Sequence, residues 1–223
     1  MRTSVGAVVL AAATLVAVAP AAALAGTAVR AASPSAVSAA TATTWTVSPG
    51  GKITAAAGKT TLADTRTGAM MTCRSARMAG TLKAGGGLPG SGIGSLATSV
   101  YPQCSAGPFP ATVTARGLPW RLNLTSYDRS TGAARGTISH LLIAFGSPEI
   151  SCSAVLNATS GTAPDGVVAV SYSSGTGILK ILPTGGDLHW YRVHQCAGII
   201  NNGDAATLTA SYTISPRQVI TSP

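Results

Sequence analysis

Short apolar-rich runs alternate with polar clusters along this chain from Trp45 onward. The runs are rich in Val, Ile, Thr and Tyr, and the clusters between them contain Gly, Pro, Asn and Asp. This punctuated pattern is typical of short strands joined by turns. The clear candidate strands span residues 111–116, 119–127, 136–145, 150–158, 166–173, 177–183, 187–196 and 206–214, and weaker candidates contain "TWTV", "KITAAA", "AMMTCRS" and "SLATSVY".

Turn chemistry supports the strand pattern. "DTRTG" (64–68), "DRSTG" (128–132) and "NNGD" (201–204) combine Asp or Asn, which bond the local backbone, with Gly, which adopts positive φ. No segment after residue 44 shows the 3.6-residue apolar period and caps of a helix. About ten short strands therefore predict an all-β domain, an antiparallel β-sandwich or barrel, with "AGGGLPGSGIGS" (84–95) as an exposed loop.

The N-terminal residues differ from the rest of the chain. Residues 1–25 carry one early charge, Arg2, then an apolar Ala-rich run ending in Ala23-Leu24-Ala25, which predicts a signal peptide rather than a transmembrane anchor. Residues 26–43 are rich in Ala, Ser and Thr without a clear period and predict a flexible leader. We expect 44–223 to form a single secreted, extracellular β-domain.

The chain contains four cysteines, Cys73, Cys104, Cys152 and Cys196. An even number in an exported chain indicates two disulfides, for which three pairings are open. A short internal similarity favours one of them: "TCRSARMAGT" resembles "SCSAVLNATSGT", and "YPQCSAG" resembles "VHQCAGI". Each half then runs from a strand cysteine to a Gln-Cys turn, which favours Cys73–Cys104 and Cys152–Cys196.

Charge limits the possible partners. Arg2 is the only charged residue of 1–25, so the remaining chain holds 14 of the 15 basic residues and all 6 acidic ones, a net charge of +8. Such a surface is attracted to anionic polymers, among them phosphate-bearing envelope polymers. The cations are dispersed and aromatic residues are few, which argues against specific nucleic-acid binding.

The stretch "GGDLHWYRVHQCAG" (185–198) gathers two histidines, Trp190 and Tyr191 around Cys196. On a regular strand Trp190 and Tyr191 point to opposite faces, as do His189 and His194, so the two histidines cannot share a metal there. We interpret the stretch as a strand anchored by Cys196, with one aromatic ring in the core and the other at the surface. The candidate ligand contacts are the four aromatic residues Trp190, Tyr191, Trp120 and Tyr127, which can stack on carbohydrate or cover an apolar ligand.

Catalytic patterns are sparse. The chain has no G-x-S-x-G, H-E-x-x-H, C-x-x-C or Walker motif, and no cofactor or metal site is predicted. A Ser-His-Asp triad stays open as an alternative because such triads assemble from distant positions. Its histidine and aspartate candidates are His140, His189, His194, Asp128, Asp187 and Asp204.

Three segments carry a wider resemblance: "GTLKAGGGLPGSGIGS", "GLPWRLNLTSYDRSTGAARGTIS" and "NNGDAATLTASYTISPRQVITSP". Over about residues 45–223 the chain resembles a group of small secreted proteins from Streptomyces and related actinobacteria. The resemblance implies secretion and a compact disulfide-bearing β-domain, and it transfers no catalytic residue.

Three functions follow as hypotheses. The first is a secreted non-catalytic module, binding or structural, held non-covalently at the cell envelope through anionic polymers or carbohydrate. The second is a hydrolase with a histidine base, which requires a histidine in reach of both a serine and an aspartate at an open cleft. The third is a carrier of a lipid-like ligand, which requires a continuous apolar cavity.

Overall fold

The computed structural model describes residues 43–223. The predicted signal peptide (1–25) and all but the last residue of the predicted leader (26–43) lie outside the described residues. Strand β1 begins at Thr44, next to the predicted start of the β-domain. Among residues 43–223 there is no helix with the length and apolar character that crossing a membrane requires.

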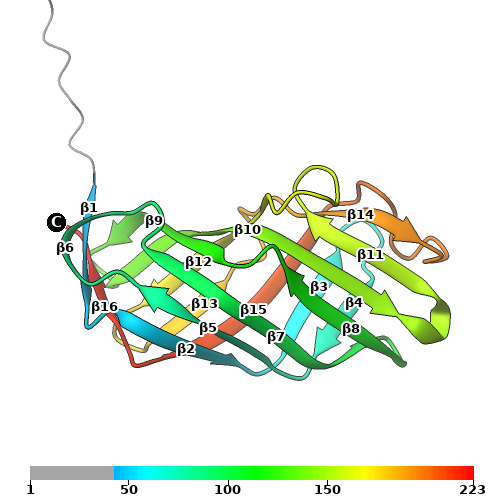
Figure 1. Ribbon diagram of the computed structural model, residues 1–223, viewed down its shortest axis with the longest axis horizontal. Coiled ribbons are helices and arrows are strands. Elements are labelled where there is room, and N and C mark those ends of the chain that lie inside the picture. Colours follow the sequence, from blue (N-terminus) through cyan, green and yellow to red (C-terminus); the bar gives the residue numbers. More distant parts are fainter. Residues whose placement is uncertain (1–42) are drawn as a thin grey trace, which may run out of the picture. The chain divides into compact units, whose positions relative to one another are not determined.

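The predicted all-β, antiparallel fold is confirmed, and it is sandwich-like (Figure 1). The described chain contains sixteen strands and one short 3-10 helix, more elements than the ten that the turn signals suggest. The strands are β1 (Thr44–Ser48), β2 (Gly51–Ala57), β3 (Thr60–Asp64), β4 (Met70–Cys73), β5 (Ala76–Leu82), β6 (Gly85–Pro89), β7 (Gly94–Ala106), β8 (Phe109–Arg116), β9 (Trp120–Asp128), β10 (Ala133–Ser147), β11 (Cys152–Asn157), β12 (Gly166–Ser173), β13 (Ile178–Ile181), β14 (His189–His194), β15 (Ala206–Ser215) and β16 (Val219–Thr221), and the 3-10 helix is η1 (Pro148–Ile150).

The higher number arises because several long strands are interrupted near the middle. β2 and β3 pair with successive parts of β15, β5 and β4 with successive parts of β7, and β9 and β8 with successive parts of β10. β12 and β11 likewise pair with successive parts of β10, on its other side. Only β7, β10 and β15 run through the interruption as single strands, and β7 and β10 do so with bulges.

The main sheet closes on itself. From β2 and β3, hydrogen-bonded pairing passes to β5 and β4, then β7, then β9 and β8, then β10, then β12 and β11, then β13 and β14, and so to β15, which pairs with β2 and β3 again. Near β14 the last step is made around the start of β15: the Trp190 N–H donates to Asp204 O at 2.9 Å, and the N–H of Ala206, the first residue of β15, donates to Leu188 O at 2.7 Å. The closed sheet therefore has two ends.

A separate small sheet, in the order β16-β1-β6, lies at one of these ends (Figure 1). It contributes Trp45, which is 1% exposed. The predicted exposed loop 84–95 is wrong in part, because residues 85–89 form β6 and pair with β1. The glycines of β6 are exposed, but their backbone is needed to complete this small sheet.

The interior next to this small sheet is filled. Leu, Ile, Met and Tyr side chains from eight strands leave a cavity of only about 20 Å³ there. Both disulfides form with the predicted pairing, Cys73–Cys104 and Cys152–Cys196, and no free cysteine occurs among the described residues. Cys73 and Cys104 are direct partners across β4 and β7, whereas Cys196 follows the end of β14.

Candidate functional site

The stretch around Trp190 forms β14, and its two aromatic rings divide as the alternation predicts. Trp190 is fully buried, and Tyr191 is half-buried, with its hydroxyl donating to Ala158 O at 3.3 Å. The alternation then breaks at Arg192, whose φ of 51° accompanies a shift of register against β11. The strand continues to His194, but the regular alternation of faces holds only as far as Tyr191.

The four predicted contact residues lie in different surroundings. Trp190 packs edge-on against Phe145, with ring centroids 6.0 Å apart. Trp120 is 1% exposed and donates its indole N–H to Arg116 O at 3.0 Å. Tyr127 packs edge-on against Trp45. The rings of Trp120 and Trp190 thus belong to the core, and only the two tyrosines reach the surface in part.

The histidine candidates lie apart from one another. The Ser139 hydroxyl is 3.3 Å from His140 Nδ1, and Asp187 Oδ1 is 3.3 Å from His189 Nδ1. His194 is exposed. Within residues 43–223 no histidine has both a serine and an aspartate in reach, so the geometry required by the hydrolase hypothesis is not formed there.

The other two aspartates of that hypothesis hold turns. Asp128 accepts hydrogen bonds from the hydroxyl and the N–H of Ser130, at 2.6 and 2.9 Å, and these bonds lower the pKa of Asp128 to about 2. Asp204 accepts from the Asn201 amide at 2.9 Å and pairs with Arg66 at 3.1 Å. These partners, Asn201 first, lower the pKa of Asp204.

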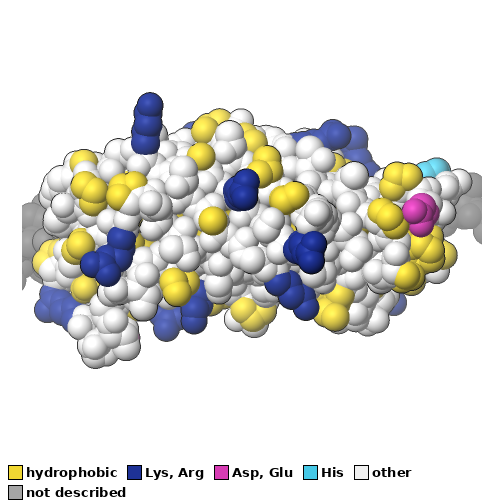
Figure 2. Space-filling view, turned by 90° about the horizontal axis from the view of Figure 1, so that it is seen from below, with side chains coloured by type: hydrophobic (Ala, Val, Ile, Leu, Met, Phe, Trp, Pro, Cys, Tyr) yellow, Lys and Arg dark blue, Asp and Glu magenta, His cyan; other side chains and the backbone are white. Residues whose placement is uncertain are grey.

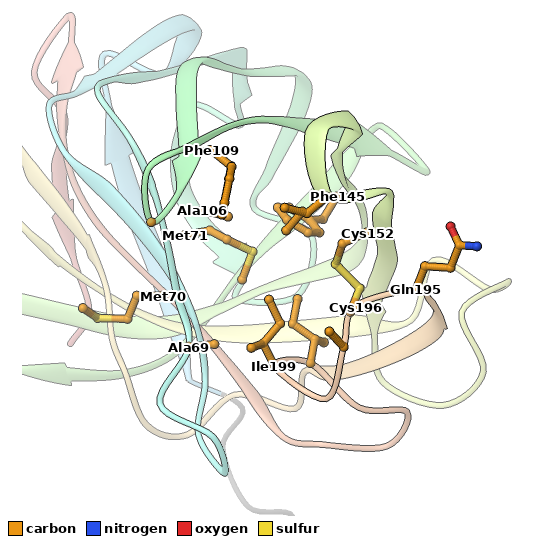
Figure 3. A pocket seen from close by; sticks show the side chains of 14 residues that line it. Ala69, Met70, Met71, Ala106, Phe109, Phe145, Cys152, Gln195, Cys196 and Ile199 are labelled. Carbon is orange, nitrogen blue, oxygen red and sulfur yellow. A yellow bond between two sulfur atoms is a disulfide. The ribbon is translucent and has the colours of Figure 1, made fainter.

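An apolar pocket of about 350 Å³ lies at the end of the closed sheet where turns and η1, rather than a small sheet, surround the interior (Figure 3). Its lining comes from six places in the chain: the turn before β4, β4 itself, the β7–β8 hairpin, β10, the segment from η1 to β11, and the loop after β14. We call it the end pocket. It is lined by Ala69, Met70, Met71, Ala106, Gly107, Phe109, Phe145, Ile150, Cys152, Gln195, Cys196, Ala197, Ile199 and Ile200.

The end pocket has a buried floor and an exposed rim. Met71, Phe145 and Ile200 are each less than 5% exposed and belong to the floor. Phe109 and Ile199, at 37% and 44% exposure, stand at the rim. Exposed apolar side chains gathered at one site mark an interaction surface more often than a scatter of single ones does.

Trp190 supports this pocket from behind its lining, and Cys196 is part of the lining itself. Phe145 faces the cavity, and the Cys152–Cys196 disulfide is part of the wall (Figure 3). The Trp190 ring packs edge-on against the Phe145 ring. Gln195, the one lining residue with a polar side chain, points away from the cavity in the same view. The stretch 185–198 therefore supports the pocket through Trp190 and lines part of it through Cys196 and Ala197, but neither Trp190 nor Tyr191 is a lining residue.

Polar contacts fix the loops that form the rim. The Thr67 hydroxyl donates to Ile199 O at 2.8 Å, joining the turn before β4 to the loop after β14. Asp64, 1% exposed, holds that turn by accepting the N–H groups of Arg66 and Thr67, each at 2.9 Å. The Arg66–Asp204 ion pair joins the same two segments again. The rim is thus anchored on both sides.

The chemistry of the end pocket is that of apolar contact. Its lining contains no carboxylate, histidine, lysine or arginine side chain. Within residues 43–223 no three His, Cys, Asp or Glu side chains come together to hold a metal ion.

Comparisons of the chain with protein-family models, with curated proteins and with solved structures found no match.

Sequence reasoning missed the residues of the end pocket. Met71, Phe109, Phe145 and Ile199 come from four separate segments, and each has the ordinary appearance of a strand or loop residue. One weak signal was present: Ile199 and Ile200 are apolar residues between the turn signals "CAG" and "NNGD". Two adjacent isoleucines in an exposed loop indicate a buried or binding role for at least one of them.

Proposed function

We propose that this protein is a secreted, non-catalytic binding module that takes an uncharged apolar ligand in the end pocket. The observation that carries the proposal is the pocket itself: about 350 Å³, apolar throughout its lining, with exposed Phe109 and Ile199 at its rim. The proposal combines the binding-module hypothesis with that of a lipid-like ligand. Two disulfides support the extracellular part of it.

Size and chemistry support a small ligand. The volume lies at the lower end of the range for small-molecule sites, which are largely apolar and preformed. A charged headgroup finds no partner inside because no lining side chain is charged, and burying an unpaired charge costs several kcal/mol. The favoured ligand is therefore an aliphatic or aromatic hydrocarbon group whose polar end, if it has one, stays in water.

The filled interior at the other end limits this binding to one place. Only about 20 Å³ is free beside the small sheet, so a long chain cannot pass through the domain. A lipid-like ligand would therefore occupy a site at one end of the domain and not a cavity that runs through it.

Calorimetric titration with a series of straight-chain primary alcohols tests the proposal. We expect affinity to rise with chain length until the pocket is full, with a negative heat-capacity change, because apolar surface is buried. A double variant, Phe109→Ser with Ile199→Ser, removes rim contacts worth about 1 kcal/mol each and lowers affinity about tenfold or more.

The control is Val100→Ser with Val219→Ser. Both valines are more than half exposed, and neither lines the end pocket. The control variant should bind the alcohols as the wild type does. The proposal fails if the wild type binds none of them, if both variants lose the same affinity, or if sedimentation shows that the rim is buried between two copies of the chain.

A further inference from the structure

The outer face of the strands β2, β5, β7, β8 and β9, together with the turns beside them, carries cations with almost no opposing charge. The single acidic residue between positions 52 and 121 is Asp64, which is 1% exposed. Figure 2 shows basic side chains along the length of one face, and it shows an acidic side chain only at one end of that face. The basic face consists of Lys52, Lys59, Arg74, Arg77, Lys83, Arg116 and Arg121, all exposed.

Strand register places part of this set in a row across the sheet. Lys52 is opposite Thr81, Thr81 is opposite Ser95, and Ser95 is opposite Arg121. Neighbouring strands lie about 4.8 Å apart, so the two cations at the ends of the row are about 14 Å apart with two hydroxyls between them. Two cations thus flank a pair of hydroxyls in one line across the sheet.

A second group lies further along the same face. Lys59, Arg74 and Gln103 surround an open hollow of about 590 Å³, together with Thr72 and Ser105. Lys59 is seven residues beyond Lys52, which is about 23 Å in extended chain. The basic face therefore has the dimensions of a track for a chain molecule rather than those of a site for one small anion.

These cations are not committed to partners within the domain. None of the seven is in an ion pair with a carboxylate of residues 43–223. None of their side chains donates a hydrogen bond there either, in contrast to Arg66 and Arg217. Their N–H groups are therefore available to a ligand. Four of the seven are arginines, whose forked donors suit phosphate.

From this arrangement we infer that the basic face binds a linear phosphodiester polymer that has no bases. Charge complementarity identifies a polyanion, since seven cations face solvent without exposed acids among them. The Thr81 and Ser95 hydroxyls donate to phosphate oxygens between cations. When these cations neutralise phosphates of the polymer, the counterions condensed on the polymer are released, and this release drives association.

The same face does not favour nucleic acid or membrane. On its strands Tyr101 and Trp120 are less than 10% exposed, Tyr127 packs against Trp45, and Phe109 belongs to the rim of the end pocket. The row from Lys52 to Arg121 therefore contains no aromatic ring that can stack on a base. Apart from Phe109 at the rim of the end pocket, Val100 is the one large apolar side chain exposed on these strands, which is too little to enter a lipid surface. A polymer of phosphates and small polyols, as in bacterial envelopes, fits both constraints.

The test measures binding of residues 26–223 to purified poly(glycerol phosphate) over a range of salt concentrations. One variant neutralises Lys52, Arg77 and Arg121 by substitution with Gln. The matched control neutralises Arg135, Lys180 and Arg192 in the same way. The control removes the same net charge and the same two arginines and one lysine, all of them exposed and all outside the basic face.

We expect the face variant to bind at least tenfold more weakly and the slope of log affinity against log salt to fall by about 2 to 3. The control should keep most of the affinity and slope, and alcohol binding at the end pocket should be unchanged in both. Equal losses in the two variants would overturn the inference, since net charge alone would then explain the binding. Equal or tighter binding to single-stranded DNA, to polyglutamate or to phosphatidylglycerol vesicles would overturn it as well.

Discussion

Removing the Cys152–Cys196 disulfide should both destabilise the domain and loosen the end pocket. The double variant Cys152→Ala with Cys196→Ala opens a cross-link between residues 44 positions apart. In the chain-entropy model, a loop of that length corresponds to about 4 kcal/mol at 25 °C. The unfolded chain regains that freedom, so the free energy of unfolding falls by about this amount.

The other disulfide supplies a matched comparison. Cys73 and Cys104 are 31 positions apart, which corresponds to about 3.7 kcal/mol in the same model. These two residues are also paired by the ladder between β4 and β7, so the strands stay together without the cross-link. Cys196 lies beyond the last ladder pair of β14, Ser153 with His194, and its loop forms part of the pocket wall.

The assay has two readouts. Urea unfolding should give a midpoint lower by about 1.5–2 M for each double variant, given the usual dependence of unfolding free energy on urea. Alcohol titration at urea concentrations well below the unfolding midpoint should then distinguish the two double variants. The Cys152 and Cys196 variant should bind at least tenfold more weakly, and the Cys73 and Cys104 variant should bind nearly as the wild type does.

Two results would refute this reasoning. If removing Cys152 and Cys196 costs less than about 1 kcal/mol, the loop after β14 is held by its polar contacts alone, chiefly the Thr67 bond to Ile199. If both double variants lose the same affinity, the pocket responds to global stability, and the disulfide has no specific role in its wall.

Two further predictions concern the interior. Gly136→Ala should lower the free energy of unfolding by about 2 kcal/mol or more in thermal melts, because a Cβ at position 136 would overlap the Asn123 carbonyl, a backbone atom that cannot move aside alone. Burial raises the pKa of Tyr101 to about 12, so its contribution to stability is present below pH 10 and is lost as pH rises from 10 to about 12. The Tyr101→Phe variant should therefore lose less free energy of unfolding than the wild type as pH rises over that range. If the two proteins lose the same amount, Tyr101 is not the group responsible.

The fold was predictable where one strand face is buried throughout. Along β12, for example, the apolar residues Val168, Val170 and Tyr172 are buried, and the residues between them are half-buried, so composition and turn chemistry sufficed. The number of strands was not predictable in the same way. The interruptions in the middle are short, such as the two residues between β2 and β3, and no single residue type marks them.

The alternation of side chains between the two faces of β14 breaks at a bulge, for a physical reason. Trp190 and Tyr191 lie on opposite faces as an unbroken strand requires, but Arg192 adopts positive φ and shifts the register of the residues after it. A non-glycine residue at positive φ has no reliable local signature, because the surrounding structure has to offset its cost. The faces of His194 and Cys196 therefore follow from packing against β11 and the disulfide, which sequence periodicity does not report.

The end pocket exists because the two ends of the closed sheet are finished differently. At one end β1, β6 and β16 supply regular strands, Trp45 is buried, and almost no space remains. At the other end turns and η1 surround the interior, and their backbone shape is set by Asp64, Thr67 and the Cys196 disulfide rather than by close packing of side chains. Loops fixed by polar contacts at their outer side leave apolar volume on their inner side. The polar contacts of these loops therefore account both for the fixed rim and for the free volume of the pocket. A ligand at the rim binds more tightly because no loop has to be ordered on binding.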